Sequence, residues 1–333
     1  MRKLSVGIVG AGEIARKVHI PVLKNIPGIS LDWIYDRDTD RCRSVAQAFE
    51  IATASTPSPH GLPACDVALV AIPVAVRSEY MAEFSSRGTA VLCEKPFAIS
   101  ELEHRRLVDL YPAHKLACGY MRRFYGSTQV LKNLCDNGWL GPLKRLAIRE
   151  GNRTQGSTIA ASFLDDPQFG WTRGVLADLG SHTIDLALYL VGAQSFAIRD
   201  REILRDGDID RKVRAAIELR PESSHRPNVT MDYCVSWLDR QPNRIELVFE
   251  RCSVWAHCSP GARVFVGNPA LPDEAVALSL PESVIAAATY NQAFYLEWLA
   301  FLKGLYNETE SAISARSSIL TTALVEQLAR VAS

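Results

Sequence analysis

The sequence lacks a long apolar run, a basic tract and closely spaced cysteine pairs. No stretch approaches the roughly 18 apolar residues that a membrane-spanning helix needs, and the first residues run straight into a patterned segment without a signal-peptide cleavage site. The eight cysteines are scattered without a C-x-x-C pair, which argues against a zinc site or a disulfide framework. These absences predict a cytoplasmic protein without a membrane partner.

The formal charges balance, because the chain has 37 Lys and Arg residues and 37 Asp and Glu residues. The longest basic clusters are pairs, so nucleic acid is not an expected partner. What is present is a composition of 47% hydrophobic and 22% charged residues over 333 positions. This composition is typical of a globular protein, and the length predicts two domains of about 150 residues each.

Short β-rich runs alternate with helical patterns in the first third of the chain. This alternation predicts a mostly parallel, doubly wound α/β sheet with helices on its faces. A capping box at Ser100 and Glu103 predicts the start of one of these helices. The expected strands are 4–9, 30–35, 67–72, 90–93 and 115–119.

Beyond residue 140 the hydrophobic period changes to two. Residues 213–219, 229–237 and 245–249 each alternate apolar and more polar side chains. This pattern predicts an α+β domain with an open, mostly antiparallel sheet that is covered on one face, or on both where two subunits meet. The tail from Tyr290 predicts two helices, with a break near 304–307.

The first expected strand ends in a G-x-G-x-x-A turn, Gly10-Ala11-Gly12-Glu13-Ile14-Ala15, and a helical pattern follows. Glycine permits a tight turn and the close approach of a pyrophosphate, and the helix N-terminus supplies free amides. Asp36 ends the next strand, 24 positions after Gly12, near the roughly 20 expected of a ribose-binding acid. The context favours dinucleotide binding over a merely structural turn.

Asp36 also bears on which dinucleotide binds. Its carboxylate can accept from both ribose hydroxyls and would repel a 2′-phosphate, which favours NAD(H). Arg37 beside it can pair with that phosphate, so NADP(H) stays open.

Lys95 is a candidate catalytic group, although an isolated lysine is more often a surface charge. Glu94-Lys95-Pro96 closes an expected strand at the carboxyl edge of the sheet, where open α/β folds bind ligands. The proline prevents a regular continuation of the strand and turns Lys95 toward the crevice.

Asp178, His182 and Asp185 follow the i, i+4, i+7 spacing of one helix face, within an arc of about 60°. Their neighbours are largely apolar, and burial of ionisable groups shifts pKa values in ways that suit proton transfer. Two other interpretations are a solvent-facing stripe and a D-x-x-x-H-x-x-D metal site.

These motifs, in this order, resemble the Gfo/Idh/MocA family of oxidoreductases over residues 4 to 192. The resemblance rests on the glycine turn, Asp36-Arg37, the strand 66–72 closing on Pro73, Glu94-Lys95-Pro96, residues 119–124 and residues 178–185.

The resemblance implies a Rossmann domain, placed at residues 1–122, and a substrate-binding and oligomerisation domain at 123–333, whose C-terminal helices are candidates to pack back on the first domain. It implies hydride transfer between NAD(P) and a secondary alcohol or ketone of a sugar, sugar nucleotide or cyclitol, without a metal. The open sheet would form a homodimer or homotetramer.

Residue roles follow from the same resemblance. The catalytic set is Lys95 as the substrate-contacting lysine, His182 as the acid/base and Asp178 as their carboxylate partner. The cofactor set is Gly10, Gly12, Glu13, Ile14, Asp36, Arg37, Pro73, Glu94 and Lys95. The expected substrate contacts are Arg123, Arg173 and Asp185.

Two departures from the family pattern matter. After Pro73 the family commonly has an asparagine and then a histidine, where this chain has Val74 and Arg77. A glycine pair is reduced to Thr172-Arg173-Gly174, and Arg173 suggests an anionic substrate. Two other functions stay open: a non-catalytic regulator that senses dinucleotides, and an enzyme that uses tightly bound NAD transiently in hydrolysis or epimerisation.

Overall fold

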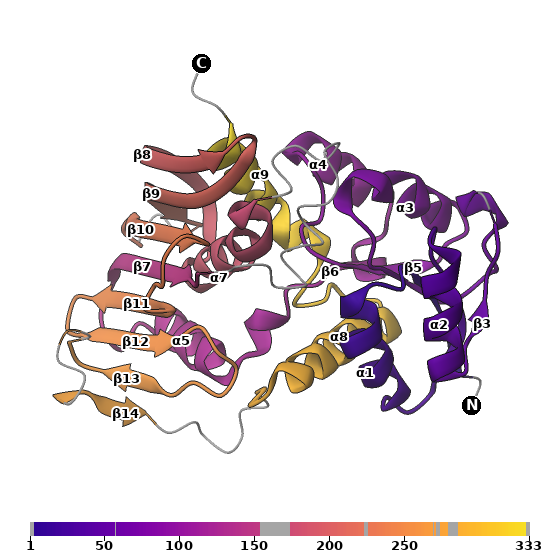
Figure 1. Ribbon diagram of the computed structural model, residues 1–333. Helices are drawn as coiled ribbons and strands as arrows, with labels where there is room; N and C mark the ends of the chain where they lie inside the picture. Colours follow the sequence, from indigo (N-terminus) through magenta and orange to yellow (C-terminus); the bar gives the residue numbers. More distant parts are fainter. Residues whose placement is uncertain are drawn as a thin grey trace. The chain divides into compact units, whose positions relative to one another are not determined.

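The computed structural model describes residues 3–56, 58–153, 174–222, 226–268, 270, 274–278 and 286–330. The chain divides into two compact units (Figure 1). The first unit comprises Met1–Tyr120 and Phe294–Ile319, and the second comprises Met121–Ala293 and Leu320–Ser333. Each unit is built from chain segments that are distant in sequence.

A six-stranded parallel sheet forms the centre of the first unit. Its order is β3-β2-β1-β4-β5-β6, which is the doubly wound order with its reversal point between β1 and β4. β4 and β5 are buried at every residue, as expected of strands covered on both faces. The strands are β1 Leu4–Val9, β2 Ile29–Tyr35, β3 Ala52–Thr53, β4 Val67–Val70, β5 Ala90–Cys93 and β6 Leu116–Cys118.

The helices between these strands are α1 (Ile20–Lys24), α2 (Thr39–Phe49), α3 (Arg77–Ser86) and α4 (Glu101–Asp109). The predicted cap of α4 is present, because the Glu103 amide donates to Ser100 Oγ at 3.1 Å. The Glu103 carboxylate in turn accepts from the amide of Ile99, the residue before the N-cap Ser100, at 2.9 Å.

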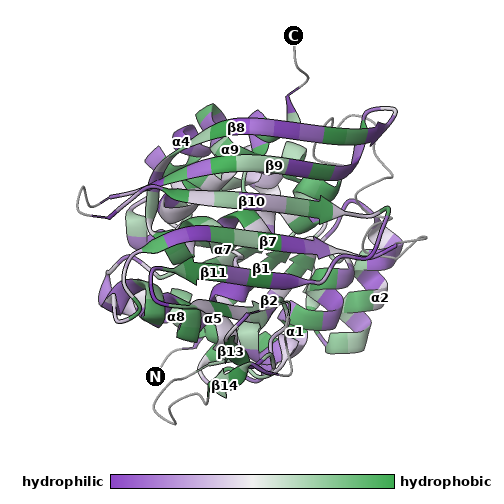
Figure 2. Cartoon of the chain, turned by 90° about the vertical axis from the view of Figure 1, so that its left-hand side faces the viewer, coloured by the Kyte–Doolittle hydropathy of each residue, from purple (hydrophilic) through white to green (hydrophobic). Residues whose placement is uncertain are grey.

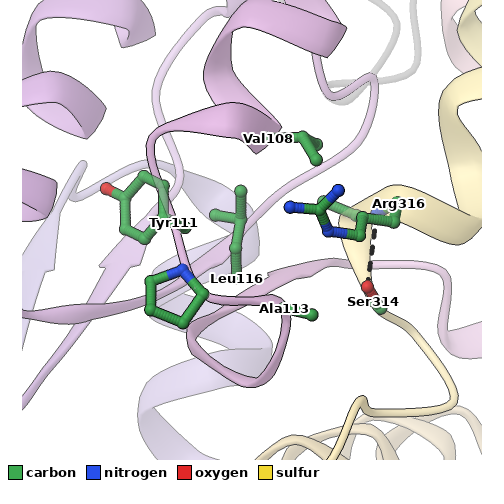
Figure 3. Close-up of a pocket in the computed structure, with 8 residues that line it drawn as sticks. Val108, Tyr111, Ala113, Leu116, Ser314 and Arg316 are labelled. Carbon is green, nitrogen blue, oxygen red and sulfur yellow. Dashed lines mark hydrogen bonds between the residues drawn. The ribbon is translucent and has the colours of Figure 1, made fainter.

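The segment Phe294–Ile319 completes the core of the first unit. It includes most of α8 (Tyr290–Asn307), whose Trp298 indole donates to His19 Nδ1 at 3.0 Å. The Cys118 amide donates to the Ile313 carbonyl at 2.9 Å. Figure 3 shows Val108, Tyr111 and Leu116 around a small pocket that Ser314 and Arg316 also line. The first unit therefore depends on residues from both halves of the sequence.

An eight-stranded sheet forms one side of the second unit, in the order β14-β13-β12-β11-β7-β10-β9-β8. Its pairs are antiparallel except β10 with β7, so the predicted mostly antiparallel sheet is confirmed. Hydrophilic and hydrophobic residues both occur along its strands (Figure 2). The strands are β7 Leu143–Gly151, β8 Ala193–Asp206, β9 Ile209–Pro221, β10 Val229–Ser236, β11 Arg244–Phe249, β12 Ser253–His257, β13 Val264–Val266 and β14 Val276–Leu278.

Three helices bury the apolar face of this sheet: α5 (Gly126–Asn137), α7 (Ser181–Val191) and α9 (Ile319–Ala329). α7 packs on β7, β9 and α5, and ten of its eleven residues are buried. Side chains from sheet and helices, such as Ile217, Met231 and Leu186, form one continuous core. Within the described part of the chain, no helix is both long and apolar enough to cross a bilayer.

His104 gives the first unit a pH-dependent stability. Its ring is fully buried against Phe97, and Nε2 lies 2.9 Å from the Ala315 carbonyl, an acceptor, so Nε2 carries the proton. Burial lowers the His104 pKa to about 4. An unfolded histidine is protonated below about pH 6.5, so the unfolded state gains a proton that the folded state resists.

We therefore expect the contribution of His104 to stability to be full above pH 6.5 and to fall by up to about 3 kcal/mol as the pH drops to 4. Urea unfolding of the wild type and His104→Gln across this range measures it. The variant should show a shallower loss of stability on acidification. Parallel pH curves for the two proteins would contradict the assignment.

Candidate active site

The residues assigned to the cofactor all lie at the carboxyl edge of the first sheet. Gly10, Gly12, Glu13 and Ile14 follow β1, Asp36 and Arg37 follow β2, Pro73 lies beyond β4, and Glu94 and Lys95 follow β5. Parallel strands bring these chain positions to one edge, and this edge holds the ligand in open α/β sheets.

The two glycines of the first turn have different constraints. Gly10 has φ +109°, and a Cβ there would lie 2.4 Å from the Ala71 carbonyl oxygen, so the fold itself requires glycine. Among the described residues, a Cβ at Gly12 would have no neighbour within 4 Å. The open space at Gly12 is what the close approach of a pyrophosphate requires.

Asp36 is buried and accepts four hydrogen bonds. Oδ2 accepts from the Ala11 amide at 2.7 Å and from Arg41 Nε at 3.4 Å, and Oδ1 accepts from the Asp38 amide at 2.9 Å and from Arg41 Nη2 at 2.8 Å. Burial acts to raise the Asp36 pKa, but Arg41 and the two amides hold it below its usual value. Asp36 is therefore a carboxylate, whereas Arg37 is exposed.

Glu94 supports the turn that carries Lys95. Glu94 Oε1 lies 2.7 Å from His19 Nε2, and Oε2 accepts from the Lys95 amide at 3.1 Å. Because the Trp298 indole only donates, His19 Nδ1 is an acceptor and Nε2 carries the proton toward Glu94. Burial opposes ionisation of Glu94, yet the bond from His19 keeps its pKa below the usual value. The Glu94 carboxylate thus stabilises the turn at Lys95 through these two hydrogen bonds.

Glu297 is fully buried in the same unit as Glu94. Burial, and then the charge of Glu94, raise the Glu297 pKa well above its usual value. Of the two acids, Glu297 therefore holds its proton more strongly, while Glu94 favours the carboxylate form.

Arg77 explains one departure from the family pattern. Its buried guanidinium donates to the Ile72 carbonyl at 2.7 Å and to the carbonyls of Glu94 and Pro96 on either side of Lys95. Arg77 therefore ties the end of β4 to the Lys95 turn, whose Lys95–Pro96 bond is cis. The sequence marked Arg77 only as unusual.

The Asp178 segment differs from the predicted regular helix. Leu176–Gly180 is a π-helical turn, and α7 begins at Ser181. Its wider winding changes the angle between Asp178 and His182, so the expected 60° arc does not apply. Such turns inside helices are frequent at functional sites. His182 is 8% exposed, and Asp178 is more accessible.

Asp185 and Arg123 form a buried bidentate ion pair. Arg123 Nε lies 2.9 Å from Oδ2, Nη2 lies 2.5 Å from Oδ1, and Thr321 Oγ1 approaches Oδ1 at 3.4 Å. The exposed fractions are 4% for Arg123 and 1% for Asp185. This enclosure does not support the expected substrate contact for either residue. The pair instead holds the turn Met121–Phe124 against α7.

Asp210 anchors the start of the π-helical turn. Its Oδ2 accepts from the Leu176 amide at 2.7 Å, and a Cβ on Gly174 would lie 1.9 Å from Oδ1. Glycine is thus retained at 174 because Asp210 occupies the space. Arg173, the third expected substrate contact, lies outside the described residues.

The metal alternative has little support in the site. Asp185 is occupied by Arg123, and within the described ranges no group of three or more His, Cys, Asp or Glu side chains could hold a metal ion.

Residues 4–121 match the model of the oxidoreductase family with an NAD-binding Rossmann fold. The predicted resemblance to the Gfo/Idh/MocA oxidoreductases is confirmed over these residues. Glucose-6-phosphate 3-dehydrogenase of Bacillus subtilis is 25% identical over 76% of this chain and 69% of its own length. D-glucoside 3-dehydrogenase of Escherichia coli is 29% identical over 57% of this chain and 54% of its own.

The fold extends across the whole chain in a solved structure. A 3-ketoreductase from Actinomadura kijaniata, in complex with NADP and TDP-benzene, superposes with a TM-score of 0.78 at 18% identity, covering 98% of this chain and 97% of that one. This similarity confirms the two-part fold. The curated relatives match over shorter spans, and this chain covers 53–59% of the length of three of them.

The contrast between the two glycines yields a prediction. Gly10→Ala should destabilise the first unit by about 1–3 kcal/mol, since it adds backbone strain and a clash with Ala71. Gly12→Ala should fold normally but lose dinucleotide affinity, because its methyl group fills the open space. Urea unfolding and NADH titration separate the effects. Equal stability losses, or unchanged affinity of Gly12→Ala, would contradict this interpretation.

Asp210 should give a pH dependence opposite to that of His104. Burial raises its pKa to about 6, so the unfolded state loses its proton first as the pH rises. The Asp210 contribution to stability should fall by up to about 3 kcal/mol between pH 4 and 6 and stay level above. Urea unfolding measures this effect, and the free energy of unfolding of Asp210→Asn should lack this decrease between pH 4 and 6. A variant with the wild-type slope would refute the assignment.

Proposed function

We propose that this protein is an NAD(P)-dependent oxidoreductase that transfers a hydride between a nicotinamide cofactor and a secondary alcohol or ketone of a sugar, sugar nucleotide or cyclitol. Three features lie at the carboxyl edge of the first sheet, each after a different strand: the open Gly12 turn, the ionised Asp36 and the Lys95 turn held by Glu94. Their position at one edge is the main support for this proposal. The family description and the names of the sugar-acting relatives support it.

The residues at this edge fit a dinucleotide. Gly12 leaves room for a pyrophosphate near the start of the helical segment that follows it, and Asp36 with Arg37 would meet the ribose. Glu13, Ile14 and Pro73 would line the same crevice. When bound, the nicotinamide supplies or accepts the hydride.

The catalytic roles concern the proton and the charge on oxygen. In the oxidative direction, His182 takes the hydroxyl proton as the carbinol hydrogen leaves as hydride, and the Lys95 ammonium stabilises the developing alkoxide. Asp178 orients the substrate or the imidazole. In the reductive direction His182 returns the proton. Glu94 and Arg77 act through Lys95 as positioning residues.

The substrate assignment rests on chemistry and on relatives. The named relatives act on glucose 6-phosphate and on a glucoside, and the solved neighbour holds a TDP compound. Arg173 is the proposed contact for a phosphate or nucleotide diphosphate on the substrate. Arg123 and Asp185 support the site through their ion pair rather than by contact.

We also retain the proposals of a cytoplasmic location and of a homodimer or homotetramer formed through the open face of the eight-stranded sheet. Its outer face carries exposed ion pairs such as Arg145 with Asp232 and Arg214 with Glu202, which suits a polar subunit interface.

Removal of either proposed catalytic side chain tests the function. Lys95→Ala and His182→Ala should each lower kcat by about 10²–10⁴ with little change in NADH affinity, because each removes a group that acts on the reacting oxygen. Turnover is measured on a panel of sugars, sugar phosphates, sugar nucleotides and inositols. Lys144→Ala, at a half-exposed lysine paired with Glu250, is the matched control. Near-wild-type kcat in either catalytic variant would remove that residue from the mechanism.

A further inference from the structure

The Asp36 carboxylate has no vacant acceptor position in this structure. A carboxylate offers about four lone-pair sites. The amides of Ala11 and Asp38 occupy one site on each oxygen, and the guanidinium of Arg41 spans both oxygens. Two ribose hydroxyls could bond Asp36 only by displacing one of these donors.

Arg41 is the donor that distinguishes this site. The two amides belong to the backbone of the glycine turn and of the cap of α2, where Asp38 Oδ1 accepts from the Arg41 amide at 3.0 Å. The Arg41 side chain is 46% exposed, whereas that of Asp36 is 6% exposed. Arg41 is therefore the donor on Asp36 that reaches solvent, and the one that an incoming ribose could displace without disturbing the backbone.

The guanidinium has N–H groups to spare. It carries five N–H groups, of which Nε and one on Nη2 serve Asp36. Within the described part of the chain, Nη1 makes one longer contact, 3.5 Å, with the half-exposed Asp38. Arg41 can therefore stay on Asp36 and present its remaining N–H groups to an incoming anion. Paired in this way, Asp36 no longer opposes a phosphate as a lone carboxylate would.

We propose that Arg41 selects the cofactor of this protein, by bridging Asp36 to the 2′-phosphate of NADP(H) and by blocking the ribose hydroxyls of NAD(H) from Asp36. The inference rests on the proposed function. It reverses the NAD(H) preference expected from Asp36 alone, and it assigns to Arg41 the phosphate contact that was left open for Arg37.

Neighbouring charges do not decide the preference. The segment from Asp36 to Arg43 holds three aspartates and three arginines, so its formal charge is zero. Arg43 pairs with Asp40 at 3.3 Å, and both side chains are largely exposed. Selection therefore depends on the geometry of the Arg41 fork rather than on a general positive field.

The test is a titration of cofactor-free wild type, Arg41→Ala, Arg41→Lys, Arg37→Ala and Arg43→Ala with NADPH and NADH, followed by nicotinamide fluorescence. The wild type should bind NADPH more tightly. Arg41→Ala should shift the ratio of the two Kd values toward NADH by about 10- to 100-fold, the value of charged hydrogen bonds. Arg41→Lys should fall between them, because it keeps the charge without the fork. Arg43→Ala should match the wild type.

Other results overturn the inference in distinguishable ways. Binding of both cofactors with an unchanged ratio in Arg41→Ala would refute selection by Arg41 and leave the proposed function intact. A shift in Arg37→Ala alone would transfer selection to Arg37. Failure of every folded protein to bind either cofactor would overturn the proposed function itself. Unfolding curves of each variant confirm that the comparison is made between folded proteins.

Discussion

The hydrogen bond from the Ala11 amide to the Asp36 carboxylate ties the glycine turn after β1 to the end of β2. This bond fixes two of the segments that a dinucleotide must touch. It is short and buried, and charge makes such a bond stronger than a neutral one. The same carboxylate also accepts from Arg41, so the glycine turn and the first turn of α2 share one buried acceptor.

A second buried network of hydrogen bonds holds the backbone on both sides of Lys95. Trp298, His19 and Glu94 form a relay of hydrogen bonds that ends on the Lys95 amide, while Arg77 holds the carbonyls on both sides of the lysine. The backbone on both sides of Lys95 is thus held by buried or partly buried hydrogen bonds. Preorganisation of this kind is what a positioned charge needs in order to stabilise an alkoxide.

The local features of the fold could be predicted from the sequence. β1 and β5 have the expected bounds, and the glycine turn and the cap at Ser100 lie where their residue types require them. The failures involve partners distant in sequence. Asp185 is an ordinary helix-face acid until Arg123 approaches it from 62 positions away, and His19 meets Trp298 across 279 positions. The π-helical turn at Asp178 involves packing on Asp210 and Gly174, which periodicity does not encode. Arg41 was missed because its fork over Asp36 appears only once α2 is folded.

We propose that the carboxyl edge of the first sheet holds a nicotinamide dinucleotide. Calorimetric titration of the folded, cofactor-free protein with NADPH tests this claim without knowledge of the substrate. We expect saturable binding with one dinucleotide per chain, displaced by 2′,5′-ADP, which carries the 2′-phosphate that Arg41 would contact. Absence of heat and of binding for both NADPH and NADH would contradict it.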